Sequence, residues 1–268
     1  MSAESTDRSI ELDRPSCQPL DGRTCLVTGG SRGIGRGIAR ELGQYGATVV
    51  VNYRSSESAA YEVADAITDA DTAGTGHVIH ADVTDRAEVD AMRDGVRDTL
   101  GPIDVLVNNA GITCDRTFDD MTADDWHRAI DVSLHGTFNC TRAFYDDFTG
   151  AEYGRIINIS SVIGKQGNVG QANYAAAKSG LFGFTRSLAL ELASASSGVT
   201  VNCVAPGFTA TEMVEAIPDD VQNELRGEIP LDRFANVDEV AGLVRYLASD
   251  AAGYITGEVI DINGGFDL

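Results

Sequence analysis

The chain has 268 residues, with 20 lysines and arginines against 41 aspartates and glutamates, and a formal net charge of -21. A negative charge of that size argues against nucleic acid and anionic membranes as partners. The five cysteines are widely spaced without a CxxC pair, and no apolar run is long enough for a signal peptide or a membrane helix. We therefore expect a cytoplasmic protein in a reducing environment, without disulfides or a metal site.

Strand-like and helix-like segments alternate after an N-terminal stretch, residues 1–19, that is polar, acidic and without periodicity. We expect that stretch to be a mobile extension. Short apolar runs predict seven strands, at 24–28, 48–52, 77–81, 105–107, 155–159, 199–204 and 258–262. Helices are predicted at 34–45, 56–70, 86–100, 122–148, 174–193 and 237–247, and the less regular residues 208–234 are expected to form a lid. The alternation predicts one α/β domain over residues 20–268, with a Rossmann-type, doubly wound parallel sheet and helices on both faces.

Tyr174 and Lys178 lie four residues apart at the start of an alanine-rich helical run, so they share one helix face, separated by about 6 Å of rise. Tyrosine and lysine at this spacing also occur by chance. Lys165 and Lys178 are the only lysines in the chain, however, so a composition that otherwise uses arginine places one of them beside this tyrosine. A neighbouring ammonium lowers the pKa of a phenol, and Ser161 follows the fifth strand within reach of a substrate oxygen. The pattern predicts proton transfer to or from an alcohol or a ketone.

A glycine-rich turn, Gly29-Gly-Ser-Arg-Gly-Ile-Gly35, follows the first strand and opens the first helix. Glycines at 29, 33 and 35 allow the backbone to approach a pyrophosphate, and the helix N-terminus supplies amide donors and a favourable dipole. A tight turn without a ligand is the alternative. The position between a buried strand and a helix favours nucleotide binding.

The second strand ends without the acidic residue that would bind a ribose 2′-hydroxyl. Arg54, together with Arg32 in the glycine turn, instead offers guanidinium groups suited to a 2′-phosphate, although both could be ordinary surface arginines. The sequence therefore predicts NADP(H) rather than NAD(H). Asp82 and Val83 after the third strand, and residues 108–111 after the fourth, are expected to form the walls of the same cleft.

The sequence resembles the short-chain dehydrogenase/reductase family over everything after the extension. The residues that carry the resemblance are Thr28 to Gly35, Asn108-Asn109-Ala110-Gly111, Ser161, Tyr174, Lys178 and Pro206-Gly207. The resemblance implies that Tyr174 is the acid and base, that Ser161 positions the substrate carbonyl, and that Lys178 lowers the phenol pKa and holds the nicotinamide ribose. It also implies NADPH/NADP+ as cofactor, bound by Gly29, Ser31, Arg32, Gly33, Ile34, Gly35, Arg54, Asp82, Val83, Asn109, Ala110, Gly111, Tyr174, Lys178, Pro206, Gly207, Thr209 and Thr211.

One position departs from the family pattern. The fourth member of the family's catalytic set is an asparagine seven residues after the tryptophan that corresponds to Trp126, and here that position is Ser133. In the family the asparagine stabilises a break in the helix, where a main-chain carbonyl holds a proton-relay water. Serine competes well for helical carbonyls, so Ser133 could bond to the backbone in its place.

Within the family, the resemblance is strongest to reductases of 3-oxoacyl thioesters. It implies reduction of acetoacetyl-CoA to 3-hydroxybutyryl-CoA for polyhydroxyalkanoate synthesis, in a homotetramer; a carrier-protein thioester, another ketone, or a non-catalytic dinucleotide-binding role are the alternatives. Asn168 and Gln171 are candidates for the acyl pocket or for capping the Tyr174 helix, and Phe208 is a further candidate substrate contact. The acidic, lysine-poor composition resembles that of proteins from salt-accumulating halophiles, which implies low stability in dilute buffer.

Overall fold

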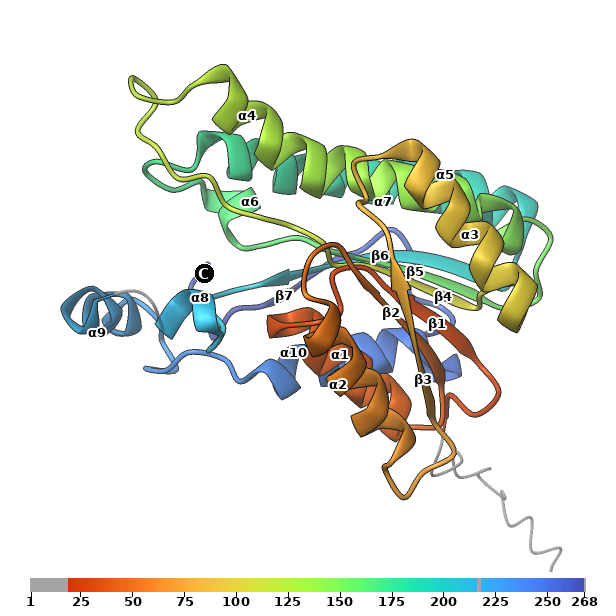
Figure 1. Cartoon of the computed structure of the whole chain (residues 1–268). Helices are drawn as coiled ribbons and strands as arrows, with labels where there is room; N and C mark the ends of the chain where they lie inside the picture. The colour runs from red at the N-terminus through yellow and green to blue at the C-terminus, as the bar shows by residue number, and fades with distance from the viewer. Residues whose placement is uncertain (1–18, 216–217, 268) are drawn as a thin grey trace, which may run out of the picture.

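The computed structural model describes residues 19–215 and 218–267 (Figure 1). The predicted N-terminal extension therefore lies, but for its last residue, outside the described part of the chain. Among the described residues, no helix is long and apolar enough to cross a membrane.

Seven parallel strands form one sheet in the order β3-β2-β1-β4-β5-β6-β7, which confirms the predicted fold. The strands are β1 (Thr24–Val27), β2 (Thr48–Tyr53), β3 (Thr75–His80), β4 (Val105–Asn108), β5 (Gly154–Ile159), β6 (Val199–Pro206) and β7 (Val259–Ile262). The order of the chain reverses between β1 and β4, and a crevice opens beyond the carboxyl ends of the strands at such a switch point.

Helices cover both faces of the sheet (Figure 1). One face carries α1 (Gly33–Gln44), α2 (Glu57–Thr68) and α10 (Val237–Ala248), and the other carries α3 (Arg86–Leu100), α4 (Ala123–Ile130), α5 (Gly136–Phe148) and α7 (Ala172–Ala195). Each face has its own apolar core, with Ile38 and Leu42 of α1 fully buried on the first and Phe144 and Phe148 of α5 fully buried on the second. The strands are therefore buried on both sides, which is why they read as continuous apolar runs.

The predicted long helix 122–148 is interrupted. α4 and α5 are joined by a π-helical turn, η1 (Asp131–His135), in which the carbonyl of Ser133 accepts a hydrogen bond from Thr137 Oγ1 at 2.8 Å. A π turn shifts the backbone pairing by one residue and is common beside functional sites. Here it lies between α4 and α5 and contains Ser133.

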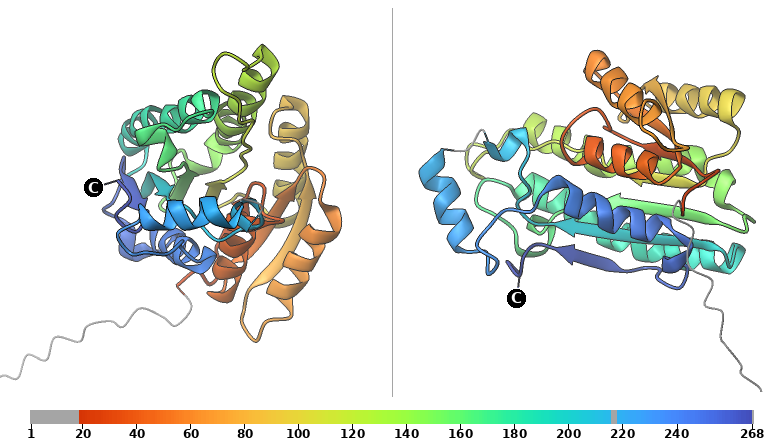
Figure 2. Two further views of the ribbon diagram at one scale, coloured as in Figure 1. Left: turned by 90° about the vertical axis from the view of Figure 1, so that its left-hand side faces the viewer. Right: turned by 90° about the horizontal axis from the view of Figure 1, so that it is seen from below.

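The segment 208–234, expected to be irregular, contains two helices, α8 (Glu212–Glu215) and α9 (Asp219–Gly227). Both stand beyond the carboxyl ends of the strands, at the end of the molecule where the described chain terminates (Figure 2). Two further short helices, α6 (Ile163–Gln166) and η2 (Asp250–Ala252), complete the described elements.

Candidate active site

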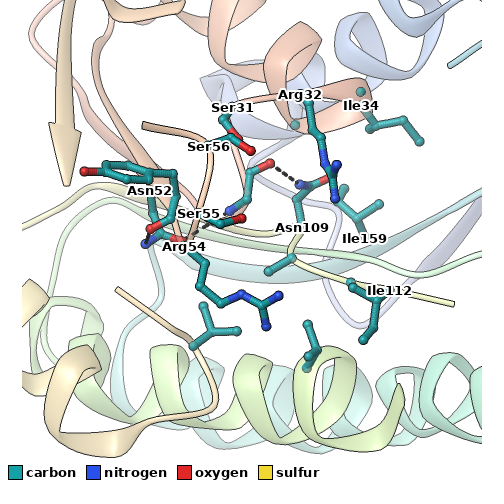
Figure 3. A pocket seen from close by; sticks show the side chains of 18 of the residues that line it. Ser31, Arg32, Ile34, Asn52, Arg54, Ser55, Ser56, Asn109, Ile112 and Ile159 are labelled. Atoms are coloured by element: carbon teal, nitrogen blue, oxygen red, sulfur yellow. Dashed lines mark hydrogen bonds between the residues drawn. The ribbon is translucent and has the colours of Figure 1, made fainter. Parts of the chain in front are cut away.

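A cleft of about 480 Å³ lies at the carboxyl ends of the central strands (Figure 3). This volume is in the range of ligand sites in proteins. Most of the cofactor residues predicted from the sequence line it: Gly29, Ser31, Arg32, Gly33, Ile34, Gly35, Arg54, Asp82, Val83, Asn109, Ala110, Gly111, Tyr174, Lys178 and Thr211. The cleft thus runs from the glycine turn to the predicted proton-transfer pair.

Close backbone packing explains why residue 35, the last glycine of the turn, has no side chain. A Cβ atom on Gly35 would lie 2.3 Å from the carbonyl oxygen of Gly29 and 2.4 Å from Asn109 Nδ2, distances that no side chain tolerates. Gly29 and Gly33 have φ angles of +61° and +54°, in the region that favours glycine. The turn therefore presents bare backbone and the N-terminus of α1 to the cleft.

The turn is held by two asparagines from neighbouring strands. Asn109 Nδ2 donates to the carbonyls of Thr28 and Gly29 at 2.9 and 3.1 Å. Asn52, at the end of β2, accepts from the amide of Gly29 at 3.2 Å and donates to the carbonyl of Ala81 at 3.1 Å. Sequence reasoning missed Asn52, which joins three strands beneath the cleft; its place between a buried valine run and Arg54 was the available signal.

Two arginines enter the cleft from different elements, Arg32 from the glycine turn and Arg54 from the residues after β2 (Figure 3). Arg32 has no ion-pair partner among the described residues, whereas Arg54 Nη1 lies 3.6 Å from Asp82 Oδ2. Ser55 and Ser56 also line this end of the cleft and were not predicted. Guanidinium groups and hydroxyls together can bind a phosphate group through several hydrogen bonds.

The carboxylate of Asp82 is already partnered. Its Oδ1 accepts from the amide and hydroxyl of Thr84 at 2.9 and 2.8 Å, while Oδ2 faces Arg54. Asp82 therefore lines the cleft mainly as a support for Arg54 and the β3 end.

The structure brings Ser161, Tyr174 and Lys178 together. The Ser161 side chain is near enough to the Tyr174 phenol to lower the phenol pKa, and Lys178 Nζ lies 5.6 Å from the centre of the Tyr174 ring. The Lys178 side chain is only 3 % exposed, and Nζ donates to the carbonyl of Ile159 at 2.8 Å. Ser160, which sequence reasoning also missed, donates to the carbonyl of Lys178 at 2.8 Å and ties β5 to α7.

The predicted effect of Lys178 on the phenol is wrong for this structure. Burial raises the pKa of Tyr174 to about 12, the Ser161 hydrogen bond opposes that rise, and the charge of Asp115 adds to it. Burial also lowers the pKa of Lys178 to about 8, because the ammonium is removed from water. Desolvation disfavours the charged form of both groups and is the largest cause of each shift. Tyr174 consequently holds its proton at neutral pH and can donate it to a stronger base.

Ser133 does not bond to the backbone as we predicted. Its hydroxyl is fully buried and has no hydrogen-bond partner within the described structure, and Thr137 supplies the bond to the Ser133 carbonyl instead. A Cβ atom on Gly111 would lie 3.4 Å from Ser133 Oγ and 3.1 Å from Lys178 Nζ, so the serine and the lysine face each other across Gly111. A buried polar group of this kind is normally satisfied by a bound water.

Several predicted residues lie near the cleft without lining it. Pro206 ends β6, the amide of Gly207 donates to Ile262 at 3.0 Å, and Thr209 Oγ1 donates to Gly207 at 3.2 Å. The ring of Phe208 packs against Phe266 at a centroid distance of 5.4 Å. Their predicted contacts with cofactor or substrate stay predictions.

Asn168 and Gln171 form a hydrogen-bonded chain with Asp115 instead of a helix cap. Asn168 Nδ2 donates to Gln171 Oε1 at 3.0 Å, and Gln171 Nε2 lies 3.1 Å from both carboxylate oxygens of Asp115. Gln171 precedes α7 but makes no side-chain capping bond to it. The capping alternative is thus excluded, while the acyl-pocket alternative remains a prediction.

The sequence is similar to known proteins over most of its length. Residues 29–267 match a family described as enoyl-(acyl carrier protein) reductase. Among similar curated proteins is the 3-oxoacyl-[acyl-carrier-protein] reductase FabG of Staphylococcus aureus, 45% identical over 243 residues, which are 91% of this chain and 97% of the relative. Proteins of the same name from Pseudomonas aeruginosa and Escherichia coli are 44% and 43% identical over 246 residues, covering 92% of this chain and 98% of each relative.

The residues of the cleft fit a dinucleotide with a 2′-phosphate. The glycine turn leaves no room for a side chain at Gly35, and Arg32, which has no ion-pair partner within the described residues, lines the cleft beside Arg54. These features and the similarity over more than nine-tenths of the chain support one assignment. The chain belongs to the short-chain dehydrogenase/reductase family, as an NADPH-dependent oxidoreductase acting on CH–OH groups.

Proposed function

We propose that this enzyme reduces the ketone of a 3-oxoacyl thioester to the 3-hydroxyacyl product. The observation that carries the proposal is the identity of 43–45% to proteins named 3-oxoacyl-[acyl-carrier-protein] reductase, which extends over nearly the full length of both chains. The grouping of Ser161, Tyr174 and Lys178 at one end of the cleft supports it independently.

Each residue has a defined task in the proposed reaction. NADPH supplies a hydride to the C3 carbonyl carbon when it is bound. Tyr174 donates its proton to the ketone oxygen, so no alkoxide has to accumulate, and the raised phenol pKa keeps that proton in place until the oxygen becomes basic. Ser161 donates a hydrogen bond to the same oxygen. Lys178, protonated below its pKa of about 8, stabilises the phenolate that Tyr174 becomes and binds the nicotinamide ribose.

The thioester carrier has two candidates. The names of the relatives favour an acyl carrier protein. The net charge of -21 favours the second candidate, acetoacetyl-CoA as a precursor of polyhydroxyalkanoate, because an acidic surface repels an acidic carrier protein. CoA is also anionic, but it inserts as a small molecule and needs no extended docking surface.

The test measures the rate of NADPH oxidation from the fall in absorbance. The two substrates are acetoacetyl-CoA and acetoacetyl carrier protein, at the same concentration in molar KCl. Turnover of either thioester supports the reductase, and the ratio of the two kcat/KM values identifies the carrier. A protein that binds NADPH but turns over neither thioester would contradict the proposal. It would leave another ketone or a non-catalytic dinucleotide-binding role.

The proposal also includes the oligomeric state and the salt concentration in which the enzyme works. We expect a homotetramer and a halophilic cytoplasm, where concentrated salt screens the acidic surface. Analytical ultracentrifugation at 0.2 M and 2 M KCl tests both expectations, since a tetramer whose share rises with salt supports them and a stable monomer at both concentrations contradicts them.

A further inference from the structure

The loop after β4 is hydrogen-bonded to the start of α7, the helix that carries Tyr174. The amide of Arg116 donates to the carbonyl of Gly170 at 2.8 Å, and Asn173 Nδ2 donates to the carbonyl of Cys114 at 3.0 Å. These two bonds flank Asp115 on both sides along the chain. They fix its backbone beside the first turn of the helix that carries Tyr174.

The carboxylate of Asp115 is held at this place by a neutral partner. Both of its oxygens lie 3.1 Å from Gln171 Nε2, and Gln171 is three residues before Tyr174. No lysine, arginine or histidine of the described chain forms an ion pair with Asp115, although twelve other carboxylates do so in thirteen such pairs. The negative charge of Asp115 is therefore uncompensated, and it acts on the phenol, whose pKa it helps to raise.

A charge at this position distinguishes between two classes of 3-oxo compound. In a free 3-oxo acid the carboxylate is one methylene away from the ketone that Tyr174 protonates. An ester or thioester of the same acid has a neutral group there. The Asp115 carboxylate is exposed, so water weakens but does not abolish its repulsion of a substrate carboxylate, whereas a neutral acyl group meets no such barrier.

We propose that Asp115 is a specificity-determining residue that excludes free 3-oxo acids from the active site and restricts the enzyme to neutral 3-oxoacyl esters and thioesters. Gln171 acts with it as a positioning residue, because its amide orients the carboxylate. The inference rests on the proposed function, since it assumes that a 3-oxoacyl ketone is reduced beside Tyr174.

The test compares acetoacetate with ethyl acetoacetate, the same ketone with and without the charge, at fixed NADPH and 0.1 M KCl. We expect Asp115→Asn to raise kcat/KM for acetoacetate about tenfold and to leave kcat/KM for the ethyl ester within about twofold, as expected for removal of one like-charge contact. Asp98→Asn is the matched control, because Asp98 is exposed on α3 and its removal changes the net charge equally. The control should not change the ratio of the two substrates.

A second measurement needs no variant. Raising KCl from 0.1 M to 1 M shortens the screening length from about 10 Å to about 3 Å. The wild-type enzyme should then gain on acetoacetate relative to the ester, while Asp115→Asn should show a ratio that is nearly independent of salt. An effect of loop loosening, by contrast, would change KM for both substrates alike and would not respond to salt.

The outcomes separate the two proposals. If the wild-type enzyme reduces ethyl acetoacetate but Asp115→Asn leaves the ratio of acid to ester unchanged, the specificity role of Asp115 is wrong and the reductase stands. If acetoacetate is already reduced as well as the ester by the wild-type enzyme, the role is also wrong. If neither the ester nor acetoacetyl-CoA is reduced, the proposed function itself fails.

Discussion

A buried cationic side chain lies at each end of the sheet, and the two differ in how many hydrogen-bond acceptors surround them. Arg155, at the start of β5, is 3 % exposed and donates to the carbonyls of Gly154 and Gly198 at 2.8 Å and to that of Ser249 at 3.4 Å. Lys178, beyond the carboxyl ends, is buried to the same extent but has a single acceptor in the described structure, the carbonyl of Ile159.

This difference separates a structural charge from a functional one. At the amino ends of the strands, the Arg155 guanidinium makes four hydrogen bonds to carbonyls and is further covered by the ring of Tyr153, 4.1 Å away, so the protein itself compensates its charge. At the carboxyl ends, Lys178 and the Ser133 hydroxyl keep donors that have no acceptor among residues 19–215 and 218–267. Burial of polar groups without partners costs stability, and it is retained where a ligand or water completes the set.

The largest expected effect sharpens the functional side of this comparison. Tyr174→Phe removes the proton donor but leaves the ring that packs beside Lys178. We expect kcat for the proposed ketone reduction to fall about a thousandfold, the middle to upper range for general acid catalysis, with no loss of NADPH affinity. Steady-state kinetics with NADPH titration by fluorescence measure both. Retention of more than a tenth of the wild-type kcat would show that another group donates the proton.

The second prediction exchanges the two buried cations for methionine. Arg155→Met removes the side-chain donors to three carbonyls, so we expect the free energy of unfolding to fall by about 3 kcal/mol. Lys178→Met removes a poorly compensated buried charge, so at pH 7 it should leave the free energy of unfolding unchanged or raise it, while abolishing activity. Urea unfolding in a fixed KCl concentration measures both variants. Equal destabilisation by the two substitutions would remove the contrast between the ends of the sheet.

Comparison of the wild-type protein with Lys178→Met also predicts how the free energy of unfolding depends on pH. The pKa of Lys178 is lowered from 10.5 to about 8 in the folded state. The unfolded chain therefore binds more protons between these values, and the free energy of unfolding should rise with pH across that window. Lys178→Met should lack this rise, which is read as the difference between the two urea curves at pH 8 and pH 10.

The third prediction concerns the cofactor end of the cleft. Arg54→Ala removes a guanidinium and leaves the carboxylate of Asp82, 3.6 Å from it, facing the cleft without its ion-pair partner. We expect the preference for NADPH over NADH to fall by about 10- to 100-fold, since a charge-assisted hydrogen bond contributes about 1.5–3 kcal/mol. Arg40→Ala is the control, because Arg40 is exposed on α1 and does not line this cleft. The ratio of kcat/KM for the two cofactors is the readout.

The fourth prediction is an alkaline limb in the pH dependence of catalysis. Below pH about 8 Lys178 is an ammonium that stabilises the developing Tyr174 phenolate, and above it the charge is lost. The kcat/KM for reduction should therefore fall about tenfold per pH unit above that value. Lys178→Arg keeps a charge that does not titrate in this range, so its residual activity should lack the limb. A wild-type profile that is flat to pH 10 would contradict the assignment to Lys178.

The fold and the outline of the site could be predicted because they depend on local patterns. Continuous apolar runs predict the buried parallel strands. The glycines of residues 29–35 and the Tyr174–Lys178 spacing are each contained in a few consecutive residues. The family resemblance implied a break in the helix at Ser133, but the π turn itself and the bond from Thr137 to the Ser133 carbonyl could not be predicted, because they depend on the folded backbone. The direction of the Tyr174 pKa shift was missed for a similar reason, since desolvation is set by the tertiary packing around the phenol.

The smallest predicted effect tests whether the orphaned hydroxyl beside Lys178 has a function. Ser133→Ala should leave the free energy of unfolding unchanged or raise it by about 1 kcal/mol, because a buried hydroxyl without a protein partner is removed. We expect kcat to fall about fivefold, equivalent to one hydrogen bond to a water between Ser133 and Lys178. Thr137→Val is the counterpart, since it removes the bond to the Ser133 carbonyl and should cost about 1 kcal/mol of stability. If Ser133→Ala instead destabilises the protein as much as Thr137→Val and leaves kcat unchanged, the hydroxyl is structural and the contrast with Arg155 holds only for the lysine.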